Sequence, residues 1–145
     1  MNTPGWGGCG SLEQKSWSAP SDAAAGIGGW VRVVGAPADR STYSWVSEAG
    51  LRWTGLVPGR ARDALGAGRV LAIVRPALRQ QVRDANAADG GARPAPDHEG
   101  VFEVAYQMQP GEHWVVTPDV QWVQHPGTTA ATANATVAGL RLAWQ

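Results

Sequence analysis

The chain has 145 residues, of which 43% are hydrophobic, and a formal net charge of zero. This size suits one domain. The basic residues are spread along the sequence without forming the stripe that follows a phosphate backbone, so we expect no nucleic-acid partner. Cys9 is the only cysteine, which excludes an internal disulfide and a cysteine-rich metal site. The 19 Gly, 10 Pro and 8 Trp favour an all-β fold with many turns.

The first 25 residues are rich in Gly, Ser and Ala and specify little structure beyond one short strand at Leu12 to Trp17. Residues 1–8 have neither a basic start nor an apolar core, so we expect no signal peptide in this chain. No run approaches the ~18 apolar residues of a spanning helix, so any membrane role would have to use strands. We assign residues 26–145 to one β-barrel-like domain.

Alternation of apolar and polar residues with a period of two predicts the next strands, because successive side chains of a strand point to opposite faces. The first runs from Ile27 to Val34 and is followed by a turn at Ala36 to Asp39. The second runs from Tyr43 to Thr54 and places Tyr43 on the same face as Trp45 and Trp53. The two strands fit a hairpin.

The stretch Gly55 to Arg60 interrupts the alternation with Gly and Pro. Another strand is predicted from Ala64 to Val74, and Arg69 is a misfit on its apolar face, since an arginine facing lipid at mid-membrane costs about 2–4 kcal/mol. Residues 76–97 read as a long loop with one helical turn around Ala77 to Val82.

The last third of the chain, Val101 to Gln145, repeats the alternation three times. Phe102, Val104 and Tyr106 fall on one face, and Glu103 and Gln107 fall on the other. The full pattern predicts an antiparallel up-and-down meander of about 6–7 strands. One face of this sheet is apolar and the other polar, which is typical of a membrane β-barrel.

Several phrases in this order and spacing are together specific, although each is weak alone. They are Gly28-Gly-Trp-Val-Arg32, Pro37-Ala-Asp-Arg40, Gly55-Leu-Val-Pro-Gly-Arg60, Tyr106-Gln, Trp114, Pro118-Asp-Val-Gln-Trp122, His125-Pro-Gly127 and Val137-Ala-Gly-Leu-Arg-Leu142. From Ile27 to Trp144, the chain resembles the carboxy-terminal part of the carbohydrate-selective porin (OprB) family.

This resemblance implies a bacterial outer-membrane barrel of roughly sixteen antiparallel strands that passes carbohydrates by passive diffusion. It further implies contact with outer-membrane lipid and assembly into a homo-oligomer. Because the chain supplies only about 6–7 strands, the resemblance implies a partial porin.

In the orientation of a porin, eight polar residues would point into the lumen, where they could exchange hydrogen bonds with sugar hydroxyls. They are Arg32, Glu48, Arg52, Glu103, Gln107, Asp119, Gln121 and Arg141. The alternative is that they only pair with one another as a solvated lining. Seven aromatic residues could form interfacial girdles or stack against sugar rings. They are Tyr43, Trp45, Trp53, Tyr106, Trp114, Trp122 and Trp144.

The sequence contains no pattern that predicts catalysis, a metal site or a cofactor. The histidines at positions 98, 113 and 125 have no recurrent ligand spacing. The acids at positions 97, 99 and 103 lack a positioned partner for glycoside chemistry, and there is no Gly-x-Ser-x-Gly elbow. We therefore expect a protein that is not an enzyme.

Two alternatives to the porin interpretation remain open at this point. A soluble β-rich carbohydrate-binding module would use exposed tryptophans as stacking platforms for sugars. A nonfunctional truncated porin remnant would aggregate through its exposed apolar strands.

Overall fold

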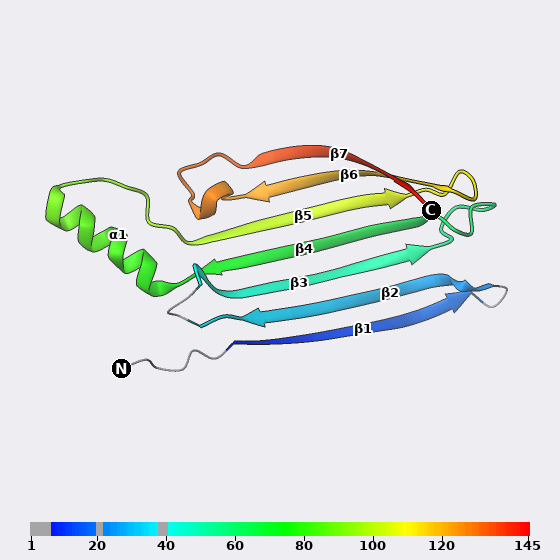
Figure 1. Cartoon of the computed structure of the whole chain (residues 1–145), viewed down its shortest axis with the longest axis horizontal. Helices are drawn as coiled ribbons and strands as arrows, with labels where there is room; N and C mark the ends of the chain where they lie inside the picture. The colour runs from blue at the N-terminus through cyan, green and yellow to red at the C-terminus, as the bar shows by residue number, and fades with distance from the viewer. Residues whose placement is uncertain (1–6, 20–21, 38–40) are drawn as a thin grey trace.

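The computed structural model describes residues 7–19, 22–37 and 41–145, and these form one seven-stranded antiparallel sheet with the strands in sequence order (Figure 1). The all-β meander expected from the sequence is therefore confirmed. The strands are β1 (Gly8–Ala19), β2 (Asp22–Gly35), β3 (Tyr43–Thr54), β4 (Ala64–Val74), β5 (His98–Gln107), β6 (Trp114–Gln124) and β7 (Ala135–Trp144). One helix, α1 (Pro76–Asp89), and a 3-10 turn, η1 (Pro126–Thr128), complete the elements.

The bounds of the strands agree with the alternation most closely in the middle of the chain. β3 and β4 begin and end at the predicted residues. β1 is longer than the predicted Leu12 to Trp17, because it pairs with β2 from Gly8 opposite Gly35 onward. Backbone pairing with a neighbour extends a strand through Gly-rich sequence that shows no alternation of its own. The turn predicted at Ala36 to Asp39 lies partly outside the described residues.

The first 14 residues of the segment predicted as a loop with one helical turn form a helix, α1, whereas residues 91–97 belong to no helix or strand. Pro76 stands in the first turn of α1, where a missing N–H costs nothing, and Gly90 ends it in the left-handed conformation with φ 70°. The residues between are mostly Ala, Leu, Arg and Gln, which are good helix formers. The flanking Pro and Gly therefore mark the ends of a helix and not the body of a loop.

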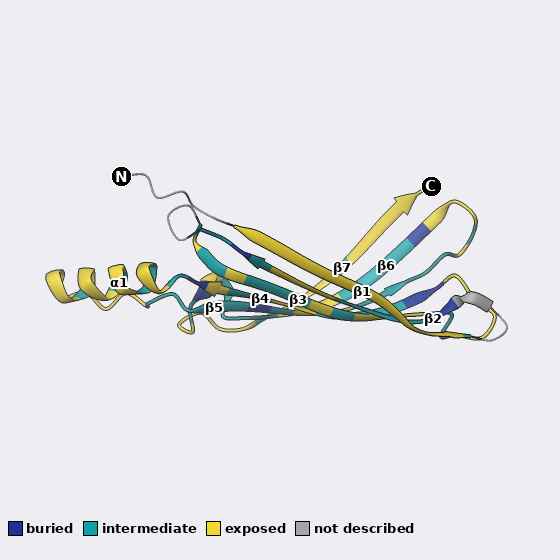
Figure 2. Cartoon of the chain, turned by 90° about the horizontal axis from the view of Figure 1, so that it is seen from below, coloured by how far each residue is buried: buried dark blue, intermediate teal, exposed yellow. Residues whose placement is uncertain are grey.

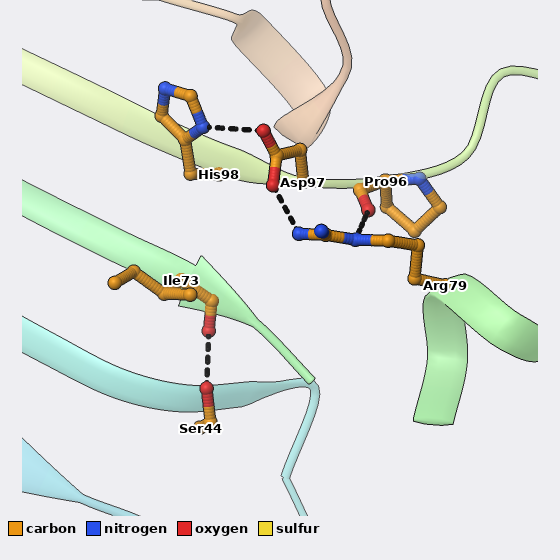
Figure 3. A network of polar contacts seen from close by, with 6 residues as sticks. All are labelled: Ser44, Ile73, Arg79, Pro96, Asp97 and His98. Carbon is orange, nitrogen blue, oxygen red and sulfur yellow. Dashed lines mark hydrogen bonds and ion pairs between the residues drawn. The ribbon is translucent and has the colours of Figure 1, made fainter. Parts of the chain in front are cut away.

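Helix α1 lies beyond the end of the sheet, between β4 and β5, and buries none of its residues (Figure 1). Arg79 holds it in place by donating from Nε to the carbonyl of Pro96 at 3.1 Å and by an ion pair with Asp97 (Figure 3). A hydrogen bond with His98 at 3.0 Å, together with the Arg79 charge, keeps the pKa of Asp97 below its usual range. Helix α1 is thus part of the connection between β4 and β5, and Arg79 attaches it to the residues that precede β5.

Among the residues that the structure describes, no helix has the length and apolar composition needed to cross a membrane.

The sheet is twisted and curved, with β6 and β7 turning away from the plane of β3 to β5, and no second layer of described residues covers either face (Figure 2). Consequently, the described residues include only four buried hydrophobic ones, Ala25, Ala64, Val74 and Val115. A soluble domain of this size normally packs two layers around a core. Here nearly all side chains of the strands remain open to the surroundings on both faces.

Candidate functional site

The eight polar residues singled out in the sequence share one face of the sheet, called here the polar face. Directly paired residues of an antiparallel sheet point to the same side. Arg32 pairs with Glu48, and Glu103 pairs with Gln121. The other members belong to this face through the same alternation, and Arg141 reaches it opposite Thr117 on β6. Five of the seven strands, β2, β3, β5, β6 and β7, therefore present the eight residues on one surface.

Pairs of these residues bind each other across neighbouring strands. Arg32 Nη1 lies 3.3 Å from Glu48 Oε2, and both side chains are partly exposed. Arg52 Nη2 donates to Gln107 Oε1 at 3.4 Å.

A second group is centred on Gln121. Its Nε2 atom donates to Glu103 at 3.1 Å and to Asp119 at 3.2 Å. Most of the eight residues therefore pair with one another, as expected for a solvated lining. Contacts of this kind between exposed groups are weak, about 0–1 kcal/mol for an ion pair, so they can be exchanged for contacts with a solute.

The polar face contains a hollow of about 690 Å³. Its floor is low because Gly28, Gly66 and Gly68 contribute no side chains. Five of the eight predicted residues line it: Glu48, Arg52, Glu103, Gln107 and Arg141. The ring of Trp30, which the sequence reasoning had not singled out, lines the same hollow. The site therefore joins charges of both signs with one aromatic ring above a glycine floor.

The opposite side, called here the apolar face, holds most of the large exposed hydrophobic side chains. Leu12, Leu51 and Leu140 are each more than 60% exposed. Val70 and Val137 are the exceptions among the strands, because their register places them on the polar face. Such a continuous apolar surface is far larger than a soluble monomer normally exposes.

Most of the aromatic residues predicted as girdle or stacking residues lie on the apolar face, and the five tryptophans among them are between 40% and 64% exposed. They are Trp45, Trp53, Trp114, Trp122 and Trp144. Trp114 and Trp144 meet edge to face with ring centroids 5.1 Å apart. The prediction for Tyr43 was wrong, because a register shift between Tyr43 and Trp45 pairs them with Val74 and Ile73, which belong to opposite faces.

Comparison with known proteins agrees with this geometry. The carbohydrate-selective porin, OprB family, matches the chain over residues 1–145. The chain belongs to this family. Among solved structures, the high-pH structure of OprB from Pseudomonas putida is similar with a TM-score of 0.87 and 21% sequence identity. The match covers 91% of this chain and 33% of that protein, so the chain spans about a third of the length of the OprB structure. No curated protein matches the chain.

In this OprB-family chain, a buried carboxylate joins two turns at one end of the sheet. Asp63 precedes β4 and forms an ion pair with Arg60 of its own turn. It also accepts from Tyr106 Oη at 2.8 Å and from the backbone N–H of Gln109 at 3.0 Å, both near the end of β5. These contacts, the Arg60 hydrogen bond foremost, lower the pKa of Asp63 to about 2. The charge of Asp63 therefore stabilises the β3–β4 and β5–β6 turns together.

The turn that contains Asp63 gives a structural reason for one of the sequence phrases that resemble the family, Gly55 to Arg60. Gly55 and Gly59 have φ values of 72° and 79°, which side chains with a Cβ rarely adopt. The N–H of Gly55 donates to the carbonyl of Asp63 at 2.8 Å and closes the turn. The stretch from Gly55 to Arg60 is thus built to return the chain sharply from β3 to β4.

Of the three histidines considered for catalysis, two lie together in the OprB-family sheet and the third lies apart. His98 and His125 have ring centroids 4.5 Å apart, whereas His113 stacks on Trp144. Glu99 accepts from the N–H of Gly127 at 2.7 Å. Within the described part of the chain, no three His, Cys, Asp or Glu residues are grouped to hold a metal ion.

Trp30 is the residue that the sequence reasoning missed on the polar face. The alternation of residues 27–34 does contain the signal, because it places Trp30 beside Arg32 and opposite Ile27 and Val31. The position of its ring could not be read from that pattern, since it depends on which residues β3 and β4 place alongside it.

Proposed function

We propose that the seven strands form one arc of the wall of a carbohydrate-conducting porin in the bacterial outer membrane. In this arrangement, the apolar face contacts lipid and the polar face borders the water-filled path. Sugars cross by passive diffusion, without a chemical step. The substrate class comes from the family to which the chain belongs.

The observation that carries this proposal is the contrast between two uncovered faces of one sheet. A soluble carbohydrate-binding module would cover its apolar face with a second layer, and no described residues do so. Hydrocarbon is a suitable environment for exposed Leu and Trp side chains, whereas water is not. The contrast therefore favours a membrane wall over a soluble module.

The eight residues of the polar face are proposed to line the path. Arginine, carboxylate and amide groups offer both donors and acceptors to sugar hydroxyls. Arg52 and Gln107 hold each other through one contact of 3.4 Å, near the upper limit for a hydrogen bond, so a passing hydroxyl could replace it at small cost. Weak, replaceable contacts suit a channel, because a solute has to leave as well as enter.

The proposed wall needs further strands, because β1 and β7 each pair on only one side within the described sheet. An unpaired edge leaves N–H and C=O groups without partners, and each such group costs several kcal/mol in hydrocarbon. We propose that additional strands pair with these edges and close the barrel. The chain would then act as part of a larger porin or of a homo-oligomer.

Sugar flux tests the proposed activity. The chain, refolded into lipid vesicles in which several copies can pair edge to edge, is expected to let them swell in glucose and to admit larger oligosaccharides progressively more slowly. Swelling is followed by light scattering. Absence of glucose-dependent swelling from vesicles that contain well-folded β-sheet protein would overturn the proposal for this chain.

A matched pair of substitutions tests whether the sugar flux follows the polar face. Gly66 and Ala67 are small neighbours on β4 that point to opposite faces, and a Cβ at Gly66 would meet no atom closer than 3.9 Å. Gly66→Trp fills part of the hollow and is expected to slow glucose entry several-fold. Ala67→Trp adds the same ring to the lipid side and should leave the entry rate unchanged. Equal effects of the two substitutions would show that the path does not follow the polar face.

A further inference from the structure

We propose that Trp30 is a stacking platform for the ring of a pyranose sugar inside the hollow of the polar face. This inference rests on the proposed function, because it names a residue that selects among solutes of the same path. It adds one prediction that the function alone does not make: a cyclic sugar binds better than an open-chain polyol that has equivalent hydroxyl groups.

The ring of Trp30 lies down over two glycines on neighbouring strands. A Cβ on Gly50 would stand 2.3 Å from Trp30 Cζ2 and Cη2, and a Cβ on Gly68 would stand 3.3 Å from Cζ2. Gly50 belongs to β3 and pairs with Trp30, and Gly68 is the next residue across on β4. Because strands lie ≈ 4.8 Å apart, a ring that reaches both must lean across the sheet. The glycines leave the space in which it lies.

This arrangement leaves the indole accessible from the hollow. Trp30 is partly exposed and is one of the residues that line the 690 Å³ space. An indole used only for packing would be buried, whereas this one is partly exposed and borders the hollow. The C–H bonds on one side of a pyranose ring form an apolar patch of matching size, and aromatic rings attract the positive edges of such groups.

Polar groups surround this platform on the same face. The cross-strand row through the ring is Glu13, Trp30, Gly50, Gly68, Glu103 and Gln121. Glu103 therefore follows the ring at the far side of the glycine gap. Glu48 and Arg52 stand two residues before and after Gly50 on β3 and line the hollow. A sugar stacked on the indole would thus present its hydroxyl edges to acceptors and a donor, while its C–H face contacts the ring.

The test measures the affinity of the full chain, refolded in vesicles, for glucose and for sorbitol by ligand-observed NMR. Sorbitol has the hydroxyl chemistry of glucose but no ring. Wild-type protein is expected to bind glucose more tightly than sorbitol. Trp30→Ala should weaken glucose binding about 2- to 12-fold, the range of one aromatic contact, and should leave sorbitol binding nearly unchanged.

Two further variants separate stacking from packing. Trp30→Leu keeps apolar bulk over the glycines without an aromatic face, so it should lose the glucose preference while the sheet stays folded. Trp53→Ala, which removes a tryptophan from the apolar face, should bind both solutes as the wild type does.

Three results would overturn the inference: full glucose affinity in folded Trp30→Leu, equal wild-type affinity for glucose and sorbitol, or no saturable glucose binding. Swelling measured on the same vesicles separates this inference from the proposed function. Glucose-dependent swelling together with unchanged affinity in Trp30→Leu refutes the platform and leaves the porin standing. Absence of both swelling and glucose binding in the wild-type protein would refute the platform and the porin function together.

Discussion

Trp30 and Trp122 show how the two faces of the sheet use the same residue type differently. Trp122 stands on the apolar face, 44% exposed and opposite Phe102 on β5. Trp30 leans over Gly50 on the polar face and borders a hollow that also contains carboxylates and arginine. The backbone is the same antiparallel ladder in both places. What differs is the set of residues alongside each ring, so the role of a tryptophan in this sheet is decided by its cross-strand neighbours.

An added charge should distinguish the polar face from the apolar face more strongly than any other substitution. Val120 is 52% exposed on the apolar face in the middle of β6, and Gln121 follows it on the polar face. Val120→Arg should destabilise the vesicle-bound protein by about 2–4 kcal/mol, because the charge enters hydrocarbon. Gln121→Arg should change stability by less than about 1 kcal/mol, since Glu103 and Asp119 are beside it. Urea unfolding in vesicles measures both, and equal costs would mean that the faces do not differ in environment.

The glycine floor offers a second contrast, within the polar face. Gly50→Ala would place a Cβ 2.3 Å from the Trp30 ring and 2.8 Å from the carbonyl of Ala67. Such overpacking costs about 1–3 kcal/mol. Gly66→Ala meets nothing closer than 3.9 Å and should stay within about 0.5 kcal/mol of the wild type. Adding Trp30→Ala to Gly50→Ala should recover part of the loss in the unfolding free energy. No recovery would show that the ring does not occupy the space over Gly50.

Acid pH distinguishes the buried carboxylate at the turns from the open charges of the polar face. The pKa of Asp63 is about 2 in the folded protein, below its ordinary value of 3.8. Its charge therefore contributes stability above about pH 4, and this contribution is lost as the pH falls toward 2. Asp63→Asn should lower the unfolding free energy by about 2 kcal/mol at pH 7. The gap to the wild type should narrow between pH 4 and pH 2, and a gap independent of pH would contradict the assigned role.

Arg69 is the residue that agrees least well with the contrast between a polar and an apolar face. It is exposed on the apolar face, opposite Ala49 and Phe102, where lipid is expected. Its long side chain can extend toward the membrane surface, which reduces the cost of the charge. Arg69→Leu should therefore stabilise the protein in vesicles by about 1 kcal/mol, whereas Arg52→Leu on the polar face should not stabilise it. Destabilisation by Arg69→Leu would indicate that Arg69 binds a partner on the apolar face.

The sequence allowed the strands and their faces to be predicted where alternation is unbroken. A period of two determines both the span of a strand such as β4 and the side on which Glu103 or Gln107 stands. It failed at Tyr43, because a register shift is a property of the pairing between β3 and β4 and not of either strand alone. A period of two also gives no information on α1, whose length depends on the helix formers between Pro76 and Gly90.

The contacts that make up the site were less predictable than the faces. Tyr106 and Gln109 bind Asp63 across 43 and 46 positions of sequence. Nothing in either local pattern indicates that contact, because it forms only when the β3–β4 and β5–β6 turns come together at one end of the sheet. The ring of Trp30 likewise depends on glycines in two other strands.

Chemical labelling of adjacent positions tests the central claim most directly. Glu103 and Val104 follow each other on β5 and point to opposite faces. With Cys9 replaced by Ser, Glu103→Cys and Val104→Cys each carry one thiol in vesicle-inserted protein. A small charged thiol reagent, followed by mass spectrometry, should modify the thiol introduced at position 103 readily and the one at position 104 hardly at all. Equal or reversed reactivity would contradict a wall with water on the polar face and lipid on the apolar face.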